Sequence, residues 1–114
     1  MGACEFSHLI ASKKKVYDVY SDLVDEAHYA HGHDPYNGTI STTNGVTQIN
    51  CPHKYGTKAF EDWTETLFER MAKRECYVAE VKLPANTAKK VRWWFNLTGA
   101  KGVKFYYFIG LAAE

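Results

Sequence analysis

Cysteine is scarce in this sequence, and its spacing matches no structural scaffold. The three cysteines, Cys4, Cys51 and Cys76, are odd in number and form no C-x-x-C pair. Neither a disulfide framework nor a zinc ribbon is therefore indicated. We expect reduced thiols, as in a cytoplasmic protein.

Long hydrophobic runs are also missing. The first residues contain no hydrophobic signal core. Every apolar run falls well short of the stretch of about 20 residues that a membrane span requires. We therefore expect no membrane partner.

The short motifs that mark common enzyme and nucleotide-binding sites are absent. The sequence contains no G-x-G-x-x-G, Walker A, H-E-x-x-H or nucleophile-elbow pattern. Its formal net charge of +1 gives little long-range attraction to a long nucleic acid. We therefore predict a non-enzymatic protein with no cofactor, no catalytic residue, no bound metal and no long nucleic acid as partner.

Aromatic residues, by contrast, are abundant. Eight Tyr, six Phe and three Trp make up 15% of the 114 residues. Rings in this number can fill a core, form an interface or stack on planar ligands. The length predicts one domain, spanning residues 1–114.

Hydrophobic periodicity predicts the order of helices and strands. Apolar residues alternate in several short runs and recur every three or four residues in two longer ones, as in strands and amphipathic helices. Asn44-Gly45 between β-branched runs is typical of a two-residue hairpin, and Thr57 is a suitable helix N-cap. The predicted elements are strand 4–11, helix 13–31, strands 39–43 and 46–49, a helix after Thr57, and strands 76–83, 90–97 and 103–111.

We expect the last two strands to form a hairpin. An even-length loop would mix Lys104 into the apolar face, whereas a three-residue loop ending in Gly102 keeps that face apolar. The second face then carries six residues: Arg92, Trp94, Asn96, Lys104, Tyr106 and Phe108. The whole order, β-α-β-β-α-β-β-β, predicts an α+β fold: a two-layer sandwich with a mainly antiparallel sheet and both helices on one face.

The second face of this hairpin is the main candidate for a ligand site. Arg92 and Lys104 offer contacts to phosphates, and Asn96 offers an amide for a base or ribose edge. The rings on the same face offer planes for stacking, which contributes roughly 1–3 kcal/mol per base in single-strand binders. The alternative is that this face packs against a helix or another subunit.

The segment after the first helix offers two weaker candidates. His28, His31 and His33 could hold zinc or supply a base, but their spacing is not that of a metal site, and the helix dipole alone favours histidine there. Successive N–H groups in the loop of Tyr36, Asn37 and Thr39 could hold an anion. We expect this loop to close one side of the ligand site, and the alternative is that it only aligns helix with strand.

The same segment carries a resemblance. The run A-H-Y-A-H-G-H-D-P-Y-N-G-T-I-S-T resembles a family of small bacteriophage-encoded proteins with the pattern A-x-Y-x-H-G-H-x-x-Y-x-G-T-I. Their aromatic last strand is similar to Y-Y-F-I-G-L-A here. The resemblance implies a small protein in the cytoplasm of an infected bacterial host. An analogy at the level of the fold extends this resemblance to oligomeric counter-defence proteins that sequester cyclic-nucleotide or ADP-ribose signals.

Three functional hypotheses follow. In the first, a non-enzymatic homo-oligomer sequesters a small phosphorylated nucleotide signal, of the cyclic oligonucleotide or cyclic ADP-ribose type, by aromatic stacking and basic contacts. In the second, the same aromatic surface inhibits a host or defence protein. In the third, the histidines serve a hydrolase that acts on phosphodiesters.

Overall fold

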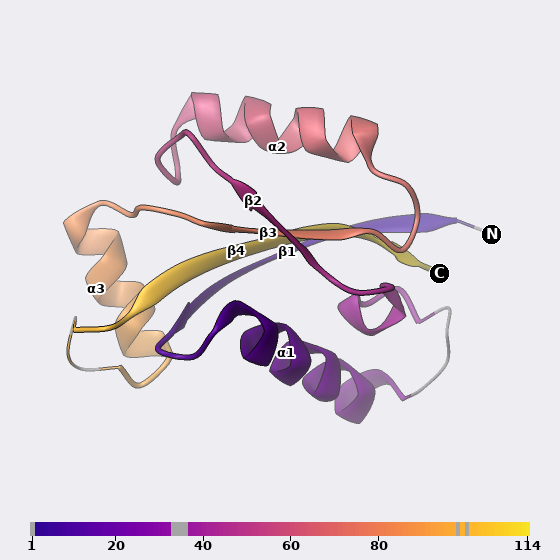
Figure 1. Ribbon diagram of the computed structural model, residues 1–114, viewed down its shortest axis with the longest axis horizontal. Coiled ribbons are helices and arrows are strands. Elements are labelled where there is room, and N and C mark those ends of the chain that lie inside the picture. The colour runs from indigo at the N-terminus through magenta and orange to yellow at the C-terminus, as the bar shows by residue number, and fades with distance from the viewer. Residues whose placement is uncertain (1, 33–36, 98, 100) are drawn as a thin grey trace.

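The fold is a mixed four-stranded sheet covered by helices (Figure 1). It is seen in a computed structural model that describes residues 2–32, 37–97, 99 and 101–114. The predicted α+β class is confirmed. The elements are β1 (Ala3–Ser12), α1 (Val16–His31), the 3₁₀ turn η1 (Ile40–Thr42), β2 (Thr47–Asn50), α2 (Lys58–Arg70), β3 (Cys76–Glu80), α3 (Ala85–Trp94) and β4 (Lys104–Ala113).

Strand β4, the last in the sequence, lies in the interior of the sheet. The strand order is β1-β4-β3-β2, in which β4 pairs antiparallel with both β1 and β3, and β2 runs parallel to β3. The pairing of β1 with β4 is unbroken from Ala3 opposite Ala113 to Ser12 opposite Lys104. The first and last strands are therefore neighbours in a mainly antiparallel sheet.

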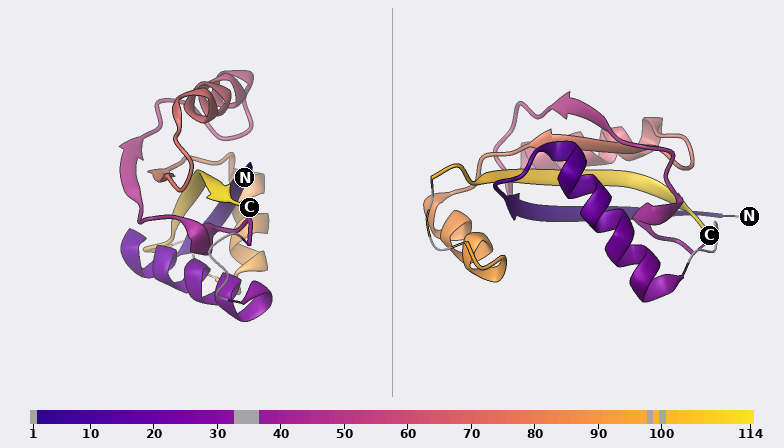
Figure 2. Two further views of the ribbon diagram at one scale, coloured as in Figure 1. Left: turned by 90° about the vertical axis from the view of Figure 1, so that its right-hand side faces the viewer. Right: turned by 60° about the horizontal axis from the view of Figure 1, so that its bottom comes forward.

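The two long helices cover opposite faces of the sheet, which corrects the predicted two-layer arrangement with both helices on one face. Figures 1 and 2 show α1 on one side and α2 on the other. Val16 and Val19 of α1 belong to a core cluster with Phe108, whereas Phe60 of α2 packs with Tyr107. Successive side chains of β4 thus enter different cores. A strand covered on both faces carries large apolar residues at consecutive positions.

The hairpin predicted for residues 39–49 does not form. Its first arm is the 3₁₀ turn η1, in which three threonine side chains bind the backbone nearby. Thr39 Oγ1 accepts from Ser41 N at 3.3 Å, Thr42 Oγ1 donates to Thr39 O at 2.8 Å, and Thr43 Oγ1 donates to Ile40 O at 2.7 Å. Such local bonds compete with a strand ladder. Only the second arm becomes a strand, and β2 pairs with β3 instead.

The C-terminal hairpin is likewise replaced, because residues 90–94 belong to helix α3 and not to a strand. Ala88 and Val91, three residues apart, are the buried positions of this helix. The apolar residues after Val91 alternate, so the short run fitted a period of two as well as a helical period. The observed order of strands and α-helices is therefore β-α-β-α-β-α-β.

Two local predictions about helix starts have different outcomes. Thr57 caps α2, accepting a hydrogen bond from Phe60 N at 3.2 Å, as expected. Helix α1 begins at Val16 instead of Lys13, and the Ser12 hydroxyl accepts from Lys14 N at 3.0 Å without capping the helix. Among the residues that the structure describes, no helix is both long and apolar enough to cross a membrane.

Gly110 of β4 provides a test of this packing. A Cβ at this position would lie 2.5 Å from the Glu75 carbonyl oxygen and 2.6 Å from Phe6 Cζ. We expect Gly110→Ala to lower the free energy of unfolding by about 1–3 kcal/mol, the usual cost of overpacking, as measured by urea denaturation. Gly99→Ala is the matched control, because nothing lies within 4 Å of its added Cβ. Equal stability of the two variants would contradict this packing.

Candidate functional site

The exposed side of α3 gathers aromatic, basic and amide groups around one hollow. The hollow has a volume of about 330 Å³ and is lined by Lys89, Arg92, Trp93, Asn96 and Leu97. Lys89 lies three and four residues before Arg92 and Trp93, so these side chains share one face of α3. Asn96 and Leu97 join them from the turn that ends the helix. The opposite face of α3 is buried through Ala88 and Val91.

Trp93, and not the predicted Trp94, is the ring that stands beside Arg92 and Asn96. Consecutive helical residues are separated by about 100° around the axis, so Trp94 lies on a different side of the exposed surface. The Trp93 and Trp94 side chains are 74% and 64% exposed. Large rings left this open on a short helix mark a surface available to a ligand or partner.

The end of α3 holds this arrangement in place. Leu97 N donates to Arg92 O at 2.8 Å, and Asn96 N donates to Trp93 O at 3.0 Å. Asn96 has a φ of 58°. This pair of bonds with a left-handed residue is a Schellman motif, for which asparagine is a suitable residue. Asn96 therefore has a structural role that the sequence prediction did not include.

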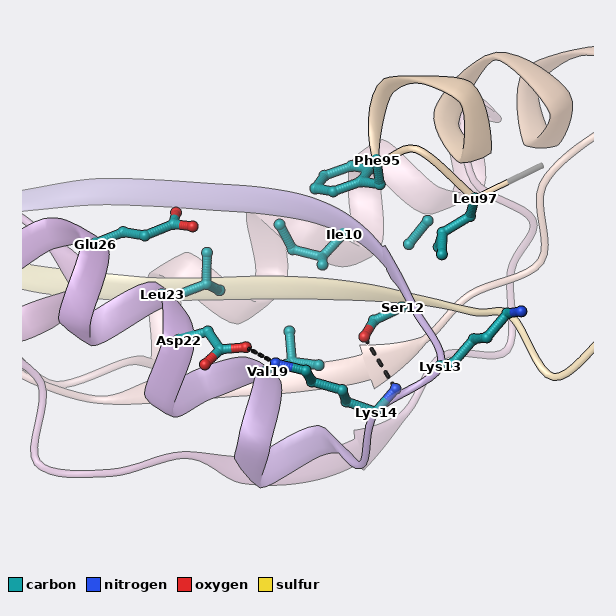
Figure 3. Close-up of a pocket in the computed structure, with 11 residues that line it drawn as sticks. Ile10, Ser12, Lys13, Lys14, Val19, Asp22, Leu23, Glu26, Phe95 and Leu97 are labelled. Atoms are coloured by element: carbon teal, nitrogen blue, oxygen red, sulfur yellow. Dashed lines mark hydrogen bonds and ion pairs between the residues drawn. The ribbon is translucent and has the colours of Figure 1, made fainter. Parts of the chain in front are cut away.

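Positive charge is concentrated at this end of the molecule. The segment from Val81 to Ala113 contains six Lys and Arg residues and no Asp or Glu. The lysine run 13–15 follows β1 at the same end, and Figure 3 shows Lys13 and Leu97 lining one cavity. One lysine of that run is paired, since Lys14 Nζ lies 2.7 Å from Asp22 Oδ2. The net charge of +1 conceals this separation of charge.

Two predicted ligand-binding rings are buried and cannot stack on a ligand. Tyr106 and Phe108 are 4% and 0% exposed because α1 covers their face of β4. Burial raises the pKa of Tyr106, whose hydroxyl donates to Lys14 O at 3.4 Å. Lys104 is exposed at the start of β4, at the α3 end of the sheet. The alternative of packing against a helix is therefore correct for the two rings.

The predicted loop lies at the other end of the sheet (Figure 1). Tyr36 is outside the described residues. Asn37 Oδ1 accepts from Thr39 N at 3.1 Å and from Thr39 Oγ1 at 2.6 Å, while Gly38 N donates to Ala113 O at 2.8 Å. The loop thus fastens the C-terminal end of β4, and it does not meet Arg92.

The histidines of this region do not form a described metal centre. His28 and His31 belong to the last turn of α1, and His33 lies outside the described residues. Within ranges 2–32, 37–97, 99 and 101–114, no three His, Cys, Asp or Glu side chains lie close enough to hold a metal ion. Cys76 is buried, and burial raises the pKa of its thiol to about 12, which makes it a poor nucleophile.

A groove between β1 and α1 was not predicted. Two cavities of about 620 and 400 Å³ share Ile10, Leu23, Glu26 and Phe95 and so form one trough, part of which is drawn in Figure 3. His8 lines the larger cavity. Burial lowers the pKa of His8, and the Glu26 carboxylate partly opposes this shift. The alternation of residues 4–11 predicts a strand, but nothing in the sequence pairs His8 with α1.

The Schellman motif predicts how Asn96 variants behave. Asn96→Ala removes the short polar side chain that makes the left-handed conformation accessible to asparagine, and it should lower the free energy of unfolding by about 1–2 kcal/mol. Asn96→Gly should leave it unchanged or slightly raised, since glycine is the preferred residue there. Denaturant unfolding of both variants measures the difference, and equal losses would argue against the motif.

The lowered pKa of His8 predicts that the free energy of unfolding depends on pH. Because its folded pKa is below 6.5, the folded protein binds fewer protons than the unfolded chain between these two values. Stability from this group is complete above about pH 6.5 and is lost as the pH falls through the folded pKa. His8→Phe should flatten that part of the curve of unfolding free energy against pH. An unchanged curve would show that His8 does not contribute.

Similarity to known proteins offers no independent guide to this surface. Comparison of the chain with protein-family models, with curated proteins and with solved structures finds no match. The function must therefore be inferred from the chemistry of the described residues.

Proposed function

We propose that the protein is a non-enzymatic binding protein that captures a small phosphorylated nucleotide on the exposed surface of α3. The observation that carries the proposal is the position of Trp93, a ring 74% exposed beside Lys89 and Arg92 in a hollow of about 330 Å³. A volume of this size falls within the range of small-molecule sites.

Trp93 supplies a plane on which a base can stack. Stacking on an aromatic side chain contributes roughly 1–3 kcal/mol per base and does not depend on base identity. Leu97 adds apolar surface to the hollow, and the Asn96 amide adds a donor and an acceptor. The hollow can therefore hold a planar heterocycle by its face and by one edge.

Arg92 and Lys89 supply positive charge for phosphate. The guanidinium group binds two phosphate oxygens at once, and the ammonium group adds a point charge. No carboxylate competes with the ligand within the sequence from Val81 to Ala113. The lysines at the same end of the molecule increase the local attraction for an anion.

The lining residues favour binding over catalysis. Lys89, Arg92, Trp93, Asn96 and Leu97 include no carboxylate, imidazole, hydroxyl or thiol group. General acid–base and nucleophilic catalysis use one of these groups or a lysine amine close to the substrate, so Lys89 is the one described lining residue of the hollow that could take part. The resemblance to bacteriophage proteins supports cyclic oligonucleotides and cyclic ADP-ribose isomers as the first ligands to test, in a counter-defence role.

A ligand panel with Trp93→Ala tests the proposal. Calorimetric titration with cyclic dinucleotides, cyclic ADP-ribose isomers and linear mononucleotides should identify one class that binds. Trp93→Ala should weaken that binding by about 5- to 150-fold, equivalent to the loss of about 1–3 kcal/mol of stacking. Product formation is followed in parallel, and turnover of the ligand would contradict a pure binding role.

Trp94→Ala is the matched control for this experiment. It removes an equally large exposed ring from the same helix, but one that does not line the hollow. We expect its affinity to match that of the unmodified protein. Asn96→Gly separately tests the amide, because it keeps the left-handed backbone. Equal losses in the two tryptophan variants would argue against a site centred on Trp93.

The alternative proposal is a protein-binding inhibitor that uses the same surface. Exposed tryptophan and arginine are among the residue types most enriched at the energetic centres of protein interfaces, and Arg92 directly precedes Trp93 and Trp94 in sequence. Failure of every nucleotide to bind, together with a protein partner that is lost in Trp93→Ala, would favour this function.

A further inference from the structure

Strand β1 has an edge that no other strand of the described residues occupies. It is the outermost strand in the order β1-β4-β3-β2, and its ten-residue register with β4 is free of bulges. It also contains no proline and only one acidic or basic residue apart from His8, namely Glu5. Proteins normally protect long edge strands with bulges, prolines or lysines. None of these protects β1, so its outer backbone groups are open to pairing with another strand.

The hydrogen-bonding pattern shows which backbone groups are free. Glu114 N donates to Gly2 O, which makes Gly2 and Glu114 a bonded pair. In an antiparallel ladder bonded pairs alternate with non-bonded pairs, so the even-numbered residues of β1 bond to β4. The N–H and C=O groups of Glu5, Ser7 and Leu9 consequently point away from the sheet.

The open part of the edge forms one wall of the trough under α1. Five consecutive residues of β1, Phe6 to Ile10, line the cavity of about 620 Å³ together with Leu23 and Ala30 of α1. Figure 2 (right) shows α1 crossing β1 and projecting beyond it. Phe6, Leu9 and Ile10 remain only half-buried. The trough thus offers both unpaired backbone and uncovered apolar surface.

The charges at the two ends of β1 favour one occupant of this edge. One end carries Lys13, directly after β1, and the other end carries Glu114, whose carboxylate lies close to Gly2. The Glu5 side chain lies on the other face of the sheet, where it lines a hollow with α2, and Glu26 lies within the trough. A strand that runs antiparallel to β1, with an acidic start and a basic end, would therefore match it. The β1 segment itself, with the Glu114 carboxylate beside its start and lysines 13–15 after its end, has this distribution.

We infer that β1 pairs antiparallel with β1 of a second copy, around a two-fold axis at Ser7, so that odd-numbered residues face each other in a continuous eight-stranded sheet. Each copy then offers its free N–H and C=O groups to the other, and the acidic start of each strand lies toward the lysines of its partner. A two-fold interface of this kind closes on itself. Helix α3 lies beside the end of β1, where Ala11 is buried, so the axis falls within the open half. The inference does not depend on the nucleotide site of α3.

Molar mass in solution tests the dimer directly. Light scattering after size exclusion should give twice the chain mass of 13.0 kDa. Ser7→Lys and Ser7→Pro should give 13.0 kDa, because lysine and proline are the residues that block natural edges. The Ser7 N–H points away from β4, so proline removes no ladder bond, and the exposed Ser7 side chain makes lysine harmless to folding. A wild-type monomer, or unchanged dimers in both variants, would overturn the inference.

Amide hydrogen exchange provides a test that needs no variant. The amides of Phe6 and His8 should be protected at every concentration, since they bond to β4. The amides of Ser7 and Leu9 should become protected only at concentrations where the dimer forms, and should exchange rapidly on dilution. Rapid exchange of Ser7 and Leu9 at all concentrations would overturn the inference, even if some other dimer were present.

Charge exchange tests the antiparallel direction. Glu114→Lys should weaken the dimer, and Glu114→Lys combined with Lys13→Glu should restore it, measured as the dissociation constant by sedimentation. These side chains are exposed, so substitution leaves the core intact. Restoration supports the antiparallel pairing of charged ends, whereas a further loss in the combined variant would contradict it.

Discussion

Strand β4 pairs with β1 along ten residues and presents large side chains to both helices, so both cores depend on it. Phe108 enters the core under α1, while Tyr107 enters the core under α2. Fully burying one such side chain contributes about 1.5–3 kcal/mol, and β4 contributes several. The sheet positions α3 indirectly, because the pairing of Ser12 with Lys104 fixes the end of the sheet beside which that helix lies.

Sequence patterns predicted the structure correctly where interactions among residues close in sequence determine it. The N-cap at Thr57, the end of α1 before Gly32 and the extent of β1 follow from side-chain bonds and periodicity within a few residues. The errors arose where distant contacts decide. Residues 39–43 formed a turn that bonds to β4, through Thr42 Oγ1 and Ala113 N at 2.9 Å. No local pattern shows that a turn 71 residues away holds the last strand.

The candidate site was predicted partly correctly, although the strand predicted for residues 90–97 is largely a helix. Residues four apart share a face in a strand, where the period is two, and nearly so in a helix, where it is 3.6. Arg92 and Asn96 therefore stayed together, although only Arg92 belongs to the helix and Asn96 lies in the turn after it. Residues two apart share a face only in a strand, so Trp94 left the group and Trp93 entered it. Tyr106 and Phe108 were lost for another reason: they lie on an interior strand covered by α1.

The adjacency of β1 and β4 also has a kinetic consequence. About a hundred residues separate the partners Ala3 and Ala113, so the loop that their pairing closes includes nearly the whole described chain. Contacts of such large sequence separation slow folding, because chain entropy is lost before the contacts form. During synthesis, β1 leaves the ribosome long before its partner β4. Until β4 arrives, β1 has two unpaired edges, and that interval is when the nascent chain is most exposed to aggregation.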